Sequence, residues 1–145
     1  MKIQVIHGPN LNMLGIREKN IYGTMSLESI NRLIGEAAEK LKIEVSIFQS
    51  NHEGSIIDKI HDCYNKYDGL VINPGAYTHY SYAIRDAIAA VSIPTVEVHL
   101  SDIQDREDFR KISVIKDVCV KQIAGKGYLS YIEGIEALLH RQEEN

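Results

Sequence analysis

The chain has 145 residues, of which 44% are hydrophobic and 25% are charged, and its formal net charge is −4 at pH 7. This length predicts one domain over residues 1–145, with enough hydrophobic residues to bury a continuous core. The small negative charge is not gathered in blocks, so general affinity for nucleic acid or for an anionic membrane surface is not expected.

The first residues, MKIQVIHGPN, carry one lysine and a short strand-like run, far less than a secretory core or a membrane span requires. We therefore expect a cytoplasmic protein. Cys63 and Cys119 lack the spacing of a zinc or redox motif. They are expected to be buried, reduced thiols on a helix and a central strand.

Short apolar runs rich in β-branched residues predict five strands, at 3–6, 43–48, 69–73, 95–100 and 118–123. Apolar residues with helical period predict helices between and after them, at 27–41, 56–67, 84–91 and 131–139. Ser26 is placed to cap the first helix, and Pro94 marks the entry to the fourth strand. The polar segment 100–117 is predicted to be a functional loop with one short helical turn.

Alternation of strands and helices predicts parallel strands joined by right-handed crossovers. The expected fold class is α/β, a three-layer sandwich with helices on both faces of a five-stranded parallel sheet. The predicted strand order is the flavodoxin-like 2-1-3-4-5. Ligands bind such sheets beyond the carboxyl ends of the strands, where the order reverses between the first and third strands.

Polar residues follow four of the predicted strands. The first strand leads into His7, Pro9 and Asn10, and the other three lead into QSNHEG (49–54), NPGAYTH (73–79) and EVHLSD (97–102). Turn preferences alone explain such clustering poorly, although Asn and Gly do favour turns. This rim of the sheet is therefore the predicted ligand site.

Three common kinds of site fit the rim less well. A phosphoacceptor domain needs acidic residues where this chain has His7 and Asn73. A dinucleotide fold needs an open glycine-rich turn, whereas GPNLNMLG places Pro9 and bulky apolar residues there. A metal site stays open as an alternative because four histidines lie at strand ends, but no HxH or HExxH pair occurs and no metal is expected.

Seven blocks resemble the type II 3-dehydroquinate dehydratase family: GPNLNMLG (8–15), REKNIYG (17–23), QSNHEG (49–54), INPGAYTH (72–79), RDA (85–87), EVHLSD (97–102) and REDFR (106–110). The resemblance implies anti elimination of water from 3-dehydroquinate to 3-dehydroshikimate through an enolate, without a cofactor. It implies a flavodoxin-like fold and a homododecamer built as a tetramer of trimers. The reaction would serve aromatic amino-acid biosynthesis, by the shikimate pathway, or quinate catabolism.

The resemblance also assigns the reacting groups: Tyr22 as the base, His99 as the acid and Asn10 as the amide that stabilises the enolate. An unperturbed phenol has a pKa of ~10 and is barely ionised at pH 7. Arg17, five residues earlier, is expected to lower the pKa of the phenol if the two side chains meet. Glu97 lies on the same strand face as His99 and is expected to orient its imidazole and keep it protonated.

Six residues are implied to bind substrate: Asn73, His79, Asp86, Leu100, Ser101 and Arg110. The amide of Asn73 and the backbone N–H groups of residues 100–101 suit a carboxylate, while Arg110 and His79 suit ring hydroxyls. Asp86 is expected to reach the site of a neighbouring subunit; the alternative is a solvated helix charge. The chain departs from the common family pattern at Lys19, in place of a proline, and at Tyr80, neither of which is a reacting group.

A noncatalytic flavodoxin-like module that binds a small anionic ligand at the same rim is the alternative function. The pair of Arg17 and Tyr22 argues against it, because a binding protein has little use for an acidified phenol. A Schiff-base route to the same product would need a lysine at the rim, and the strand-end motifs contain none.

Overall fold

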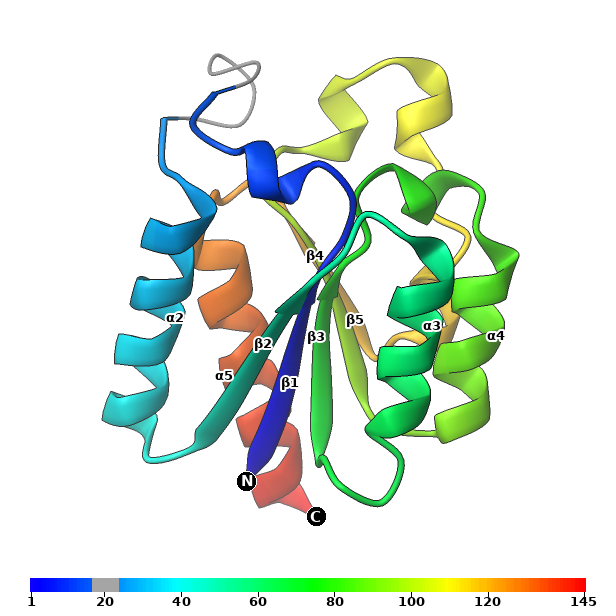
Figure 1. The fold of residues 1–145 in the computed structure, drawn as a ribbon. Helices are drawn as coiled ribbons and strands as arrows, with labels where there is room; N and C mark the ends of the chain where they lie inside the picture. Colours follow the sequence, from blue (N-terminus) through cyan, green and yellow to red (C-terminus); the bar gives the residue numbers. More distant parts are fainter. Residues whose placement is uncertain (17–23) are drawn as a thin grey trace.

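The computed structural model describes residues 1–16 and 24–145. Its centre is a five-stranded parallel sheet with the order β2-β1-β3-β4-β5, which confirms the predicted topology (Figure 1). The strands are β1 (Lys2–His7), β2 (Glu44–Gln49), β3 (Gly69–Asn73), β4 (Thr95–His99) and β5 (Lys121–Ala124). Because all five run the same way, their carboxyl ends meet at one edge of the sheet.

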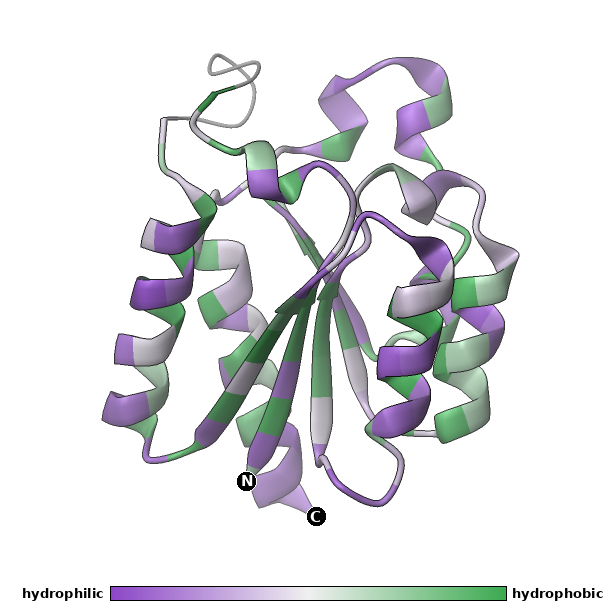
Figure 2. Ribbon diagram, viewed as in Figure 1, coloured by the Kyte–Doolittle hydropathy of each residue, from purple (hydrophilic) through white to green (hydrophobic). Residues whose placement is uncertain are grey.

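Helices cover both faces of the sheet. On one face lie α2 (Leu27–Leu41) and α5 (Leu129–Glu144), and on the other lie α3 (Glu53–Asp62) and α4 (Tyr82–Val91) (Figure 1). Hydrophobic residues predominate in the middle strands and on the inward sides of the helices, while the outward sides of α2 and α3 are hydrophilic (Figure 2). The expected three-layer α/β sandwich is therefore confirmed.

Successive residues of a strand point to opposite faces, so each strand contributes to two cores. Val5 of β1 and Val71 of β3 pack toward α2 and α5, whereas their neighbours Ile6 and Ile72 pack toward α3 and α4. All four are fully buried. This alternation also decides which layer supports each side chain at the strand ends.

Local signals fix where the helices begin. The side chain of Ser26 accepts a hydrogen bond from the backbone N–H of Ser29 at the start of α2, as the sequence predicts. Ser81 caps α4 in the same way by accepting from the N–H of Ile84. Five single 3-10 turns lie in the loops of the described residues: η1 (Leu11–Met13), η2 (Gly75–His79), η3 (Ile103–Asp105), η4 (Asp108–Lys111) and η5 (Lys116–Val118).

The prediction for the last strand was wrong at its start. The N–H groups of Val118 and Cys119 donate to the carbonyls of Ile115 and Lys116, so these residues close a turn, and β5 begins only at Lys121. β5 is also an edge strand, so Cys119 lies before an edge strand and not on a central one. Similarly, the segment 100–117 holds more than the one expected helical turn, because η3 and η4 lie within it and η5 begins near its end.

Both cysteines are free thiols. Cys63 is fully buried and follows α3 directly, while Cys119 is partly buried. Burial raises the pKa of Cys63 to about 11 and that of Cys119 to about 12, so both thiols stay protonated at neutral pH. Over the described residues, no helix has the length and apolar character needed to cross a membrane.

Candidate active site

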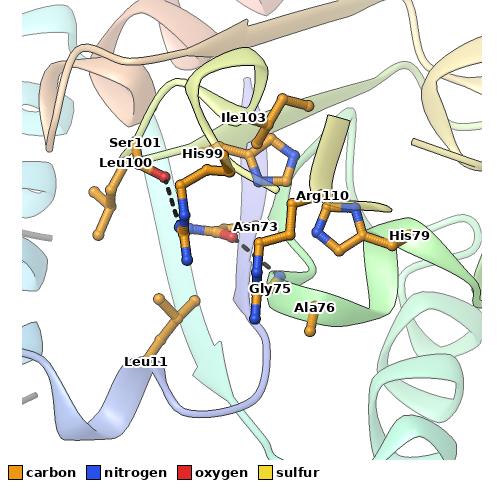
Figure 3. Close-up of a pocket in the computed structure, with 11 residues that line it drawn as sticks. Leu11, Asn73, Gly75, Ala76, His79, His99, Leu100, Ser101, Ile103 and Arg110 are labelled. Carbon is orange, nitrogen blue, oxygen red and sulfur yellow. Dashed lines mark hydrogen bonds between the residues drawn. The ribbon is translucent and has the colours of Figure 1, made fainter. Parts of the chain in front are cut away.

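A pocket opens at the carboxyl ends of β3 and β4, where the topology predicts a ligand site. The residues that line it come from three loops (Figure 3): Leu11, Asn73, Gly75, Ala76, His79, His99, Leu100, Ser101, Ile103, Arg106 and Arg110. The first follows β1, the next four belong to the β3 end and η2, and the rest belong to the β4 end and the loop with η3 and η4. The switch between β1 and β3 therefore borders the pocket.

The loops after β1 and β3 pack directly against each other. The N–H of Gly8 donates to the carbonyl of Asn73 at 2.7 Å, and a Cβ built on Gly8 would lie only 2.6 Å from the carbonyl carbon and oxygen of Pro74. Only glycine fits this approach. The chain then turns through Asn10, whose φ of 68° is tolerated well by asparagine, and whose N–H donates to Oδ1 of Asn51.

His99 is held by a buried carboxylate. Nε2 of His99 lies 2.5 Å from Oε2 of Glu97, which also accepts hydrogen bonds from the hydroxyls of Thr78 and Ser113. Glu97 is fully buried and His99 is 6% exposed. Burial alone would raise the pKa of Glu97, but the hydrogen bond and charge of His99, together with the two hydroxyls, lower it, so the carboxylate is ionised.

His79 also lines the pocket and is held by a backbone carbonyl group. Its Nδ1 donates to the backbone carbonyl of Ile112 at 2.7 Å. Burial lowers the pKa of His79, with smaller effects of the same sign from His99 and Arg110, although the bond to Ile112 opposes them. The neutral ring consequently carries its lone pair on Nε2, which is an acceptor suited to a hydroxyl group.

Asn73 ends β3 and is only 3% exposed. Its Oδ1 accepts from the N–H of Gly75 at 3.1 Å, and its Nδ2 donates to the hydroxyl of Tyr131 at 3.0 Å. These two bonds define which end of the amide is oxygen and which is nitrogen. His7, which the sequence places at the same rim, is instead fully buried behind it, with contacts to Tyr131 and Asn31.

The charge of the described lining is positive. It includes two arginines, Arg106 and Arg110, and no aspartate, glutamate or lysine. The guanidinium of Arg106 lies 3.4 Å from Oγ of Ser101, and Nε of Arg110 lies 3.3 Å from Oε2 of Glu107, which is outside the lining. Such a lining favours a small anionic ligand that also carries hydroxyl groups.

The structure brings together most of the residues predicted for the site. Six of them line the pocket: Asn73, His79, His99, Leu100, Ser101 and Arg110. Glu97 stands behind His99, in the position expected for a group that orients the imidazole. Asn10 is exposed and is not among the residues that line the pocket, although the next residue, Leu11, is.

Three other predicted residues are not brought into this pocket by the described part of the chain. Asp86 lies exposed on α4 and is not among the residues that line the pocket. Arg17 and Tyr22 lie outside the described residues, as does Lys19. The base and its activator therefore stay predictions.

Five further lining residues were not predicted as ligands: Leu11, Gly75, Ala76, Ile103 and Arg106. Arg106 had a signal, since it begins the REDFR block and has the same charge as Arg110. Gly75 and Ala76 fall within the strand-end block INPGAYTH. Leu11 and Ile103 carry no chemical signal, because an apolar residue in a loop is indistinguishable in sequence from one that packs on the core.

Among residues 1–16 and 24–145, no group of three or more His, Cys, Asp and Glu side chains is placed to hold a metal ion. The described site is instead built from an imidazole with a buried carboxylate, a second neutral imidazole, an oriented amide and two guanidinium groups.

The fold and the pocket together define the class: a flavodoxin-like α/β protein with an arginine-lined pocket, holding a histidine–glutamate pair, at the carboxyl ends of its strands. The model of the family described as dehydroquinase class II matches residues 1–139. The chain belongs to the dehydroquinase class II family, as its sequence motifs predict.

Individual relatives agree with this assignment. The 3-dehydroquinate dehydratase of Caldicellulosiruptor bescii is 61% identical over 138 residues, covering 94% of this chain and 95% of that protein. That of Thermotoga petrophila is 53% identical over 144 residues, covering 99% of each. The crystal structure of type II dehydroquinase from Butyrivibrio crossotus has a TM-score of 0.95 at 58% identity, covering 96% of this chain and 97% of that one.

Proposed function

We propose that this chain eliminates water from 3-dehydroquinate to give 3-dehydroshikimate, by an enolate mechanism at the pocket between β3 and β4. Membership of the class II family supports a hydro-lyase of the shikimate pathway. The observation that carries the assignment of this pocket is the pairing of His99, on its wall, with the buried and ionised Glu97.

The elimination needs a base for the proton next to the ketone, a donor for the enolate oxygen and an acid for the departing hydroxide. His99 is the proposed acid, because hydroxide leaves poorly unless it is protonated. Tyr22, activated by Arg17, is the proposed base, and the amide of Asn10 is the proposed donor to the enolate. No metal or other cofactor is required by this scheme.

Substrate binding is proposed to use the rest of the lining. The carboxylate suits the amide of Asn73 with the backbone at Leu100 and Ser101, while Arg110 and the neutral His79 suit ring hydroxyls. An acceptor on Nε2 of His79 supports this arrangement, since a hydroxyl donates to it without any change in protonation.

The assembly is proposed to be a homododecamer built from trimers, with Asp86 reaching the pocket of a neighbouring subunit. Asp86 is exposed on α4, and Tyr82, one helical turn earlier on the same side, is 65% exposed. Exposed aromatic residues such as Tyr82 are enriched in interfaces. A cytoplasmic location is also proposed, in keeping with two free thiols.

The direct test adds 3-dehydroquinate to the purified protein, without metal and with a chelator, and follows the absorbance of the conjugated enone product. We expect turnover that the chelator leaves unchanged, and insensitivity to borohydride in the presence of substrate. Tyr22→Phe should abolish turnover while circular dichroism shows an intact fold. Full activity in Tyr22→Phe would remove the proposed base, and tight binding without product would favour a binding module.

A further inference from the structure

A chain of buried hydrogen bonds runs away from the pocket behind Asn73. Nδ2 of Asn73 donates to the hydroxyl oxygen of Tyr131 on α5, at 3.0 Å. The same hydroxyl lies 2.8 Å from Nδ1 of His7 on β1, and Nε2 of His7 lies 2.8 Å from Oδ1 of Asn31 on α2. Tyr131 and His7 are both fully buried, so water does not compete for these groups.

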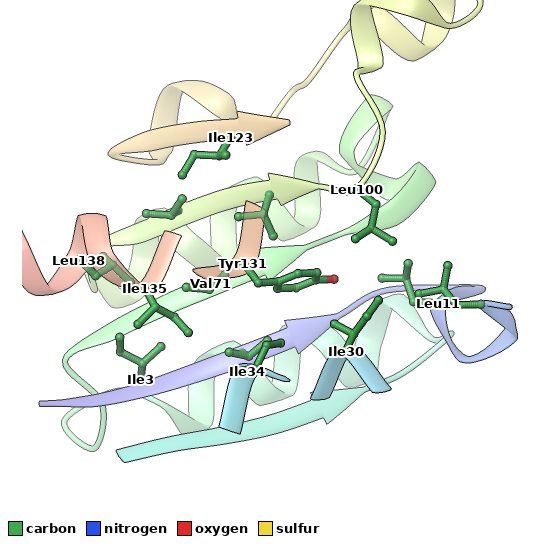
Figure 4. Packing of buried hydrophobic residues seen from close by; sticks show 14 residues of the cluster. Ile3, Leu11, Ile30, Ile34, Val71, Leu100, Ile123, Tyr131, Ile135 and Leu138 are labelled. Atoms are coloured by element: carbon green, nitrogen blue, oxygen red, sulfur yellow. The ribbon is translucent and has the colours of Figure 1, made fainter. Parts of the chain in front are cut away.

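The figures show how this series of hydrogen bonds reaches the site. The ring of Tyr131 lies against one face of the sheet, with its hydroxyl directed toward the end where Leu11 and Leu100 lie (Figure 4). Leu11, Leu100 and Asn73 all line the pocket (Figure 3). The phenol therefore spans from the hydrophobic core to the back of the pocket wall.

The donors and acceptors fit in one direction only. Since Asn73 donates to the oxygen of Tyr131, the phenolic hydrogen is free to donate to Nδ1 of His7, and Nε2–H of His7 then donates to Oδ1 of Asn31. The opposite tautomer of His7 would leave the phenolic hydrogen unpaired and would set a ring lone pair against the oxygen of Asn31. Burial lowers the pKa of His7 to about 4, although the bond to Asn31 opposes this, so the ring is neutral as the pattern requires.

We infer that Tyr131, oriented by His7 and Asn31, is a positioning residue that fixes the amide of Asn73 as a hydrogen-bond donor to the substrate. Oδ1 of Asn73 is occupied by the N–H of Gly75 and one Nδ2 hydrogen by Tyr131, which leaves the second Nδ2 hydrogen for a ligand in the pocket. At this point the pocket selects an acceptor, such as a carboxylate oxygen, and disfavours a donor. The inference rests on the proposed function.

The test is Tyr131→Phe, which removes one oxygen and keeps the ring. Because Asn73 would contact a carboxylate that does not react, ground state and transition state should lose the same interaction. We expect KM for 3-dehydroquinate to rise about fivefold, as for one lost neutral hydrogen bond, while kcat stays within about twofold. The dissociation constant measured by calorimetry should rise by the same factor, and this measurement holds even if the wild type does not turn over.

Three comparisons separate positioning from a general loss of stability. Tyr67→Phe also removes a phenolic hydroxyl bonded to a serine, Ser46, but Tyr67 precedes β3 at the opposite end of the strand, so KM should not change. In an Asn73→Ala background, Tyr131→Phe should add nothing further to KM, because the group that it positions is already absent. Asn31→Ala changes the last residue of this hydrogen-bond series, and it should raise KM about twofold with kcat again retained.

An unchanged KM and dissociation constant in folded Tyr131→Phe would overturn the inference. So would an equal further rise in KM when Tyr131→Phe is added to Asn73→Ala. An inactive wild type that still binds 3-dehydroquinate would refute the proposed function, while the dissociation constants would still decide the role of Tyr131.

Discussion

At the scale of single residues, the pairing of Glu97 with His99 is the feature on which the proposed proton delivery depends. The carboxylate accepts hydrogen bonds from the imidazole and from the hydroxyls of Thr78 and Ser113, in a place where water is excluded. In such surroundings a charged partner is worth far more than it is at the surface. The orientation of the proposed acid is thus built into the end of β4.

Glu97→Gln should show whether the charge or the shape of residue 97 orients the imidazole of His99. The amide keeps the size of the side chain but removes the negative charge and turns an –NH2 group toward donors, so kcat should fall by about 10- to 100-fold with a smaller change in KM. Steady-state kinetics would measure this. Glu133→Gln, at a surface pair with Lys126, is the control and should keep full kcat; an equal loss in both variants would contradict the role of Glu97.

At the scale of the elements, the site depends on how closely two loops approach. Gly8, after β1, contacts the backbone of Asn73 and Pro74, after β3, with no room for a side chain. The strand ends thereby hold Asn10 and Asn73 on adjoining loops. The rigid Gly-Pro turn is a structural device that serves the site, as the sequence indicates.

Gly8→Ala should force these loops apart, since backbone atoms at 2.6 Å have no rotamer by which to yield. We expect a loss of about 2 kcal/mol or more of unfolding free energy and a fall of at least about tenfold in kcat/KM. Gly35→Ala is the matched control, because no atom lies within 4 Å of its added Cβ and Ala favours a helix by about 1 kcal/mol. Denaturant titration and kinetics of both variants check this. Unchanged unfolding free energy and kcat/KM in Gly8→Ala would show that the loops are free to separate.

At the scale of the whole molecule, the question is whether one chain makes a complete site. Asp86 is absent from the described lining of its own pocket, and the proposal places it in that of a neighbour. Light scattering should therefore give the mass of twelve 16.4 kDa chains, about 200 kDa.

Complementation between inactive variants tests the shared site more directly. Asp86→Ala and Tyr22→Phe should each be nearly inactive alone, yet co-expressed chains should regain part of the activity, because mixed assemblies contain sites with Tyr22 from one chain and Asp86 from another. Co-expression of Tyr22→Phe with His99→Ala is the control, since both residues are proposed to act within one chain, and should stay inactive. Absence of complementation in verified mixed assemblies would place Asp86 in its own site or outside any site.

The stability of the whole molecule should depend on pH through His7. Its pKa is about 4 in the folded chain against an ordinary 6.5, so the unfolded chain binds the proton first as pH falls. Stability from this group is complete above pH 6.5 and is lost as pH falls through about 4, a difference of about 3 kcal/mol. Denaturant titrations from pH 7 to 4, at fixed protein concentration, should show that the unfolding free energy of His7→Gln falls less steeply with falling pH. The same pH dependence in His7→Gln and the wild type would exclude His7 as its cause.

Much of this architecture was predictable from sequence, because strand and helix periods, the Ser26 cap and the order of polar strand ends are local signals. The pairing of Glu97 with His99 was predictable too, since residues two apart on a strand share a face. Tyr131 was not, because its apolar helical position is typical of a core residue and only the fold brings its hydroxyl to Asn73. The predicted start of β5 was also wrong, because Val118 and Cys119 have strand propensity but are held in a turn.

The alternation of side chains across the sheet has a consequence for how this molecule tolerates change. Asn73 is backed by His7, Tyr131 and Asn31 in the layer of α2 and α5, whereas Glu97 and His99 belong to the opposite layer with Thr78. The two groups have no member in common, so substitutions in one should combine additively with those in the other. An engineer, or natural selection, is thus able to retune ligand preference and proton transfer one at a time.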